Sequence, residues 1–211
     1  MADVTLKEKA YQELRKLILE GQLIQGETLT ERSLVEKLQM SRTPIRSAIE
    51  RLEAGGLVTY TPNRGVSISE MSLEKVVDFF DFRLAIESYV VRRLTIQTIS
   101  NSDKEWMERN LEEQKKCLEA NDYSNFTVLD SEFHRKLALI YGNMEIIQVM
   151  ERLQDKLFQT ALRVLRKDHS RIQVSFNDHF HIYQCIIKGE PEEATREIVQ
   201  HLEFGKRILL Y

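Results

Sequence analysis

Four residues in the second half of the sequence have side chains of the kind that bind divalent metal ions, namely Asp130, His134, His179 and His201. Asp130 and His134 are four positions apart, so on a helix they lie on one face and could hold the same ion. Each histidine falls in register with the apolar residues of its own predicted helix, so we expect all three to face the interior. One carboxylate and three imidazoles suit a divalent transition metal that keeps a position open for water or another ligand.

Each of these histidines, taken alone, is more often a hydrogen-bonded core residue than a metal ligand. Four inward polar groups from three helices favour a shared ion, yet histidines that hydrogen-bond an effector without any metal remain an open alternative. His169 and His181 are left out of the site. His169 falls in a predicted loop, and His181 lies about 200° around its helix from His179.

The segment that must position these residues shows a helical pattern almost throughout. Periodic apolar residues and helix-end signals predict six helices, at 73–99, 103–120, 122–141, 143–167, 171–188 and 191–210. We expect these helices to form an antiparallel bundle, because short connections join helices that run side by side in opposite directions. Inward side chains from different helices would then converge on one core site.

Residues 1–70 show a different pattern, in which short helices precede a hairpin. A first helix ends at Gly21, and Thr30 and Ser41 can cap two further helices with a very short connection between them. Two tightly joined short helices predict a helix-turn-helix. Two β-rich runs around the turn at 61–65 then predict a small β-hairpin wing.

The chain of 211 residues is long enough for two compact domains, and its 42% hydrophobic and 30% charged residues fit a globular protein. We place a winged-helix domain at 1–70 and an all-helical domain at 71–211, so the fold class is mainly α. Its apolar stretches are far shorter than a membrane span of about 20 residues. Two cysteines give no disulfide framework. We therefore expect a cytoplasmic protein with no membrane partner.

The third predicted helix has the pattern of a helix that reads DNA. Its apolar residues fall on one arc, whereas Arg42, Thr43 and Arg46 fall on the opposite arc near the helix start. Arginine suits this task because its planar guanidinium can donate two hydrogen bonds to guanine or grip a phosphate. The net charge of -3 excludes a wholly basic coat, so DNA contacts must come from a local patch. For these residues alone, a merely solvated face is the alternative.

Residues 30–66, TERSLVEKLQMSRTPIRSAIERLEAGGLVTYTPNRGV, resemble the DNA-binding signature of GntR-type regulators at almost every position. The resemblance implies that double-stranded operator DNA is contacted by Arg32, Arg42 and Arg46, with Thr43, Arg64 and Gly65 as helpers. Arg32 precedes the recognition helix, where a phosphate contact fits better than base readout.

The helical segment resembles the FCD domain of the FadR branch of this superfamily, through the residues DSEFHR at 130–135, Gly142-Asn143, DHFHI at 178–182 and His201. This resemblance implies that Asp130, His134, His179 and His201 hold a divalent ion such as zinc or nickel. It also implies that Arg83, four residues before Glu87, contacts an effector. A structural ion pair between those two residues is the alternative for Arg83.

Together these features predict a transcription regulator rather than an enzyme. Binding of a small organic or sugar acid at the metal site would shift the two DNA-binding domains of a homodimer and change their fit to two half-sites. One alternative is a metal sensor, in which the ion itself is the signal. A metal-dependent hydrolase is a further alternative, but no catalytic motif accompanies the ligands.

Overall fold

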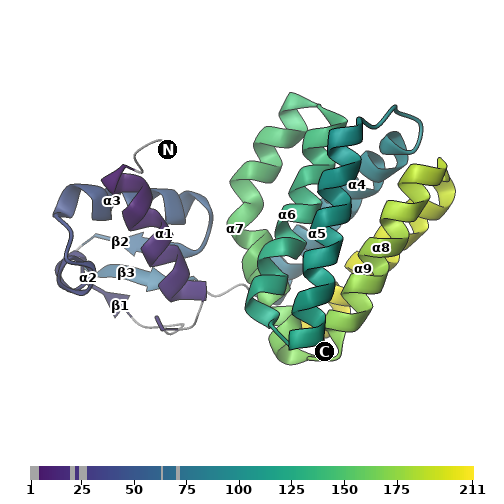
Figure 1. Cartoon of the computed structure of the whole chain (residues 1–211). Helices are drawn as coiled ribbons and strands as arrows, with labels where there is room; N and C mark the ends of the chain where they lie inside the picture. The colour runs from purple at the N-terminus through teal and green to yellow at the C-terminus, as the bar shows by residue number, and fades with distance from the viewer. Residues whose placement is uncertain (1–4, 20–21, 24–27, 63, 70–71) are drawn as a thin grey trace. The chain divides into compact units, whose positions relative to one another are not determined.

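The computed structural model describes residues 5–19, 22–23, 28–62, 64–69 and 72–211 (Figure 1). The chain divides into two compact units, residues 1–71 and 72–211, which are described separately. The predicted helix stop at Gly21 and the predicted domain boundary after residue 70 lie outside the described residues.

The first unit contains three helices and a small sheet (Figure 1). Its elements are α1 (Leu6–Leu19), β1 (Thr28–Leu29), α2 (Glu31–Leu38), α3 (Arg42–Ala54), β2 (Val58–Thr61) and β3 (Gly65–Ile68). The strands form an antiparallel sheet in the order β1-β3-β2, and α1 packs against α3. This is the predicted winged helix-turn-helix. Strand β1 was not predicted, because two residues show no periodicity and this strand forms only by pairing with β3.

The helix-turn-helix follows from local signals in the sequence. Thr30 caps α2 as predicted, because its hydroxyl accepts a hydrogen bond from the backbone N–H of Ser33 at 3.1 Å. Gln39 ends α2 in the left-handed conformation, with φ of 53°, and α3 begins three residues later after Ser41. The predicted core arc of α3 is buried, namely Ile45, Ala48, Ile49 and Leu52.

The wing depends on a glycine at residue 65. Gly65 has φ of 101°, and a Cβ atom there would overlap the backbone carbonyl oxygen of Leu29 in β1. We expect Gly65→Ala to destabilise this unit by about 1–3 kcal/mol, because neither the backbone conformation nor the neighbouring carbonyl can accept a methyl group. Calorimetric unfolding of the whole chain measures this loss. Gly205→Ala, where a Cβ would lie 3.5 Å from the Phe80 ring, should not lower the unfolding temperature.

The second unit is an all-helical bundle. Its helices are α4 (Leu73–Leu94), α5 (Asn101–Ala120), α6 (Tyr123–Tyr141), α7 (Met144–Lys167), α8 (Arg171–Lys188) and α9 (Pro191–Leu210). Side chains of Ser72, Ser100, Asp122 and Asn143 cap four of these helices by accepting backbone hydrogen bonds. None of the helices in the described part of the chain is long and apolar enough to cross a membrane.

Helix α4 ends five residues earlier than the sequence predicts, at Leu94 instead of residue 99. The backbone N–H groups of Ile96 and Gln97 bond to carbonyls three residues back, so the last turn tightens and the helix runs out. The apolar periodicity that predicted a longer helix comes from Ile99, which is buried from the connecting segment.

Packing in the bundle brings helices that are distant in sequence together. Helix α4 lies along α9, α6 packs between α5 and α7, and α8 contacts both α5 and α9 (Figure 1). Most of the interior is apolar. One group of polar side chains from α4, α6, α8 and α9 is nevertheless almost fully buried, and comprises Arg83, Glu87, Asp130, His134, Arg171, His179 and His201.

Candidate metal centre and nucleic-acid interface

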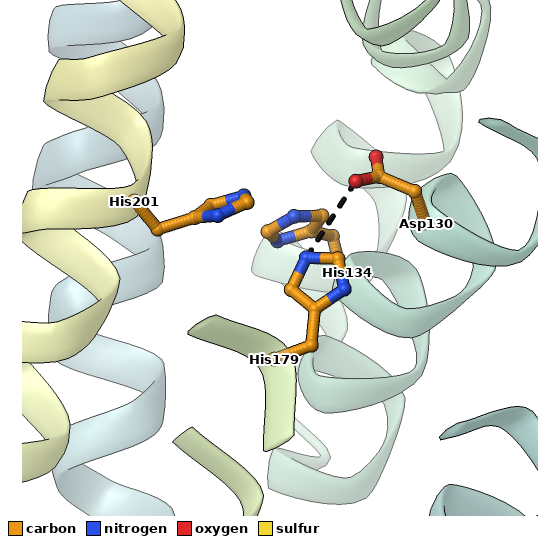
Figure 2. Close-up of side chains that lie close together, drawn as sticks. All are labelled: Asp130, His134, His179 and His201. Carbon is orange, nitrogen blue, oxygen red and sulfur yellow. Dashed lines mark ion pairs between the residues drawn. The ribbon is translucent and has the colours of Figure 1, made fainter. Parts of the chain in front are cut away.

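The structure brings together the four residues that the sequence analysis singled out (Figure 2). Helix α6 contributes Asp130 and His134, α8 contributes His179, and α9 contributes His201. Each residue offers one potential ligand atom, and these four atoms lie within 4.8 Å of one another. All four residues are buried, and His179 is completely inaccessible. This spacing would allow one ion to contact all four residues.

Each histidine has its Nδ1 atom next to a polar side chain outside the cluster. Nδ1 of His134 lies 2.5 Å from Glu87 of α4, although this contact lacks the angles of a good hydrogen bond. Nδ1 of His201 lies 3.0 Å from Asp178 of α8. Carboxylates on Nδ1 favour the tautomer whose Nε2 carries the lone pair, which is how metal-binding histidines are usually oriented.

The tautomer of His179 follows from a chain of amide hydrogen bonds. Asn110 donates to the backbone carbonyl of Leu129 at 3.1 Å, so its side-chain oxygen is the atom that accepts from Gln114 at 2.7 Å. The oxygen of Gln114 therefore faces Nδ1 of His179 at 2.8 Å and can only accept. Nδ1 must carry the hydrogen, and Nε2 of His179 is left with a lone pair.

The Nε2 atoms facing the cluster lack partners. Nε2 of His134 and Nε2 of His179 are buried without a hydrogen bond to any described residue, and the latter is 3.5 Å from a carboxylate oxygen of Asp130. A buried polar atom left unpaired costs about 1–3 kcal/mol, so such atoms call for an explanation. A metal ion bound by these nitrogens would supply one. The residues therefore fit the ion that the family resemblance implies.

Electrostatics keep two of the histidines ready to bind a cation. Burial, reinforced by neighbouring histidines and arginines, lowers the pKa of His179 and of His201 well below the usual range, so both are neutral near pH 7. Burial also raises the pKa of Asp130, against the opposing effect of His134, Arg83 and Arg171. A divalent cation would offset this cost of a buried carboxylate, and neutral imidazole is the form that coordinates metals.

Glu87 connects the cluster to Arg83, the residue predicted to contact an effector. Nε of Arg83 donates to Glu87 at 2.6 Å, and both side chains are almost fully buried. Burial alone would raise the pKa of Glu87, but Arg83 and His134 outweigh it and hold that pKa well below its ordinary value. The structure thus shows the ion pair that the sequence left as the alternative for Arg83, which also lines a small cavity beside the cluster.

Sequence reasoning did not single out Arg171 and Gln114. Arg171 begins α8 and is only 1% exposed, and it donates to Asp178 at 2.9 Å and to the backbone carbonyl of His201 at 3.1 Å. Its position shares the buried face of α8 with Ser175 and Ile182, a periodicity that could have indicated an inward arginine. Gln114 is buried next to Leu111 on α5, and nothing in its own helix pointed to His179.

The hydrogen bond from His179 to Gln114 leads to a prediction. We expect Gln114→Leu to weaken metal binding by about 10–100-fold, because partners that orient a metal-bound histidine typically contribute that much. Competition with a metal chelator measures the affinity. Gln173→Leu is the matched control, since Gln173 is exposed on α8 and should leave the affinity unchanged. Equal affinities for both variants would contradict the role of Gln114.

The predicted DNA-binding residues all lie in the first unit. Arg42, Thr43 and Arg46 are exposed at the start of α3, and Arg64 is exposed in the wing. Nε of Arg46 donates to Glu31 of α2 at 2.9 Å. Three further facts complete the set: Arg32 is exposed and pairs with Glu36, the backbone N–H of Arg64 donates to Thr61, and Gly65 permits the wing turn. Recognition helix and wing thus present exposed donors.

Comparison with known proteins agrees with this architecture. The FCD domain matches residues 78–204, and the bacterial regulatory proteins of the gntR family match residues 6–68. The HTH-type transcriptional repressor RspR of Escherichia coli is 28% identical over 199 residues, which cover 94% of this chain and 86% of RspR. The HTH-type transcriptional repressor NanR of Klebsiella aerogenes is 29% identical over 223 residues, covering 96% of this chain and 85% of NanR.

Among solved structures, the Escherichia coli protein McbR has the same fold, with a TM-score of 0.81 at 18% identity over 98% of this chain and 97% of that one. The FCD match alone spans more than half of the sequence. These matches confirm the family resemblance seen in the sequence. This protein therefore belongs to the GntR family of bacterial transcription regulators, with an FCD domain of the FadR type after its winged helix.

Proposed function

We propose that this protein is a transcriptional repressor whose affinity for operator DNA is controlled by a small organic acid, bound beside a divalent metal ion in the helical unit. The observation that supports the proposal most strongly is the convergence of Asp130, His134, His179 and His201 in a buried site. Unpaired Nε2 atoms in that site suit zinc or nickel. The ion, when bound, would supply a positive charge and an open position that attract a carboxylate.

The DNA-binding part of the proposal rests on the first unit. Regulators of the GntR family bind operator DNA, and the relatives RspR and NanR are named transcriptional repressors. Arg42 and Arg46 at the start of α3, and Arg64 in the wing, are exposed where a winged helix meets DNA. A homodimer follows from this proposal, because two half-sites on one face of DNA require two reading heads related by two-fold symmetry.

Ligand control requires that the site distinguishes two arrangements of the protein. A ligand shifts such an equilibrium only by its difference in affinity for the two states. Helices α4, α6, α8 and α9 all contribute side chains to the site, so a ligand there can favour one packing of these helices over another. Helix α4 follows directly after the first unit in sequence, so a shift of α4 would change the positions available to the winged helix.

Native mass spectrometry with elemental analysis tests the proposal first, because both report subunit number and bound metal. We expect a dimer with one divalent ion per chain. Operator affinity should then be measured for the metal-loaded protein with and without organic acids, and again after chelation. An operator affinity that no acid changes would contradict ligand control, and a metal-free protein would contradict the metal centre.

A metal sensor is the second candidate function, and the size of the cavity favours it. The cavity beside Asp130 and His201 has a volume of about 30 Å³. By the usual measure this holds about two water molecules, which is less space than a sugar acid needs. Titration of metal against operator affinity, with no organic molecule present, distinguishes the two functions. A large change in operator affinity would identify the ion as the signal.

A further inference from the structure

The cavity beside the candidate metal centre has a polar wall on one side. Its lining includes Asp130 and His201, which are two of the proposed ligands, together with Arg83, Arg171, Ser175 and Gly205. A Cβ atom at Gly205 would lie 3.5 Å from the ring of Phe80 and 3.9 Å from Val164, which also line the cavity. The missing side chain of Gly205 therefore helps to keep this space open.

The two arginines of the cavity differ in how completely their donors are used. Arg83 directs Nε and Nη2 at the carboxylate of Glu87, at 2.6 and 3.5 Å. Arg171 uses Nη2 for Asp178 and for the backbone carbonyl of His201, but its Nη1 atom is buried and bonds to no residue that the structure describes. A buried guanidinium nitrogen without an acceptor is costly, so an oxygen placed there would be stabilised.

The charges around the cavity also indicate the ligand. Arg83 and Arg171 provide two positive charges, and Glu87, Asp130 and Asp178 provide three negative charges, which leaves one negative charge in excess. A divalent ion at the proposed centre reverses this balance to one positive charge. Net charge in a buried site is unfavourable. A ligand with one negative charge would restore neutrality, whereas a neutral ligand or a polyanion would not.

We infer that Arg171 binds the carboxylate of the effector, and that the effector is a small monocarboxylic acid. The inference rests on the proposed function, because the charge balance requires the divalent ion. Arg83 is then chiefly the partner of Glu87, which orients His134. The cavity of about 30 Å³ fits the assignment, since it accommodates a few heavy atoms and no large acid without rearrangement.

Calorimetric titration of the full-length, zinc-loaded protein tests this inference with acetate, glycolate and citrate as probes. The double variant Arg171→Gln with Asp178→Asn removes the guanidinium and its partner's charge together, so no buried carboxylate is left unpaired. We expect acetate or glycolate to bind the native protein at least about tenfold more tightly than citrate. The double variant should lose at least about tenfold in affinity for the monocarboxylates while it keeps one zinc ion per chain.

Two further variants make the test specific. Gly205→Ala adds a methyl group to the cavity without touching a polar residue, so it should weaken monocarboxylate binding and retain zinc. Arg109→Gln is the matched control, because Arg109 is exposed on α5, and its affinities should equal those of the native protein.

Each other outcome has a defined meaning. If the zinc-loaded native protein binds neither acetate nor glycolate, or if the double variant binds them as tightly as the native protein, the inference is overturned and the metal centre stands. If the double variant loses zinc as well as acid, Arg171 positions His201 and does not bind the effector, which also overturns the inference. A native protein that takes up no zinc overturns the proposed function itself.

Discussion

Replacing His134 with alanine is expected to remove the divalent ion from the helical unit and to abolish the response of operator binding to the effector. His134 would supply one of four ligands, and its Nε2 atom is buried with no hydrogen-bond partner among the described residues. Loss of a residue that merely orients a ligand costs about 10–100-fold in metal affinity, so loss of a ligand should cost more. Elemental analysis after dialysis measures the retained metal.

The matched control for this variant is His181→Ala. His181 lies on α8 two residues after His179, but it is exposed and its nearest acidic partner, Glu197, is 3.9 Å away. We expect this variant to keep one ion per chain. The circular dichroism spectra of both variants should remain largely helical, because Glu87 keeps its pairing with Arg83 when His134 is removed. His134→Ala protein that still holds one ion per chain would show that the assignment is wrong.

The positions of the four candidate ligands could be predicted because each one lies on the buried stripe of its own helix. Asp130 and His134 share a face with Phe126, Phe133 and Leu137, all of which are buried. Helical periodicity is a local property, so the sequence alone places these side chains inward. The exposure of His181 follows from the same periodicity, and the structure agrees.

The residues that orient the ligands could not be predicted, because they come from other helices. Glu87 on α4 and Gln114 on α5 meet His134 and His179 only after the bundle has packed. Which helices become neighbours, and in what register, depends on the tertiary structure and leaves no periodic signal in one sequence. Strand β1 escaped prediction for a similar reason, since its two residues depend on β3 for their pairing.

Replacing Arg46 with alanine is the second variant for which we expect a large effect, a loss of about 1–3 kcal/mol in specific operator binding. Its side chain is 62% exposed on the recognition helix and is held by Glu31 of α2, which also lies 3.5 Å from the hydroxyl of Tyr60 in β2. An exposed ion pair contributes at most about 1 kcal/mol, so Arg46 can exchange Glu31 for a base. Fluorescence anisotropy with operator DNA measures the loss.

The type of contact made by Arg46 determines how its loss depends on sequence and salt. If Arg46 reads a base, alanine should weaken operator binding far more than binding to unrelated DNA, and the salt dependence should change little. If it grips a phosphate, both affinities fall together and the salt slope decreases by about one. Arg109→Ala, on the exposed face of α5, should change neither quantity. Unchanged operator affinity in Arg46→Ala would remove this residue from the interface and leave Arg42 and Arg64 as the exposed arginines of α3 and the wing to test next.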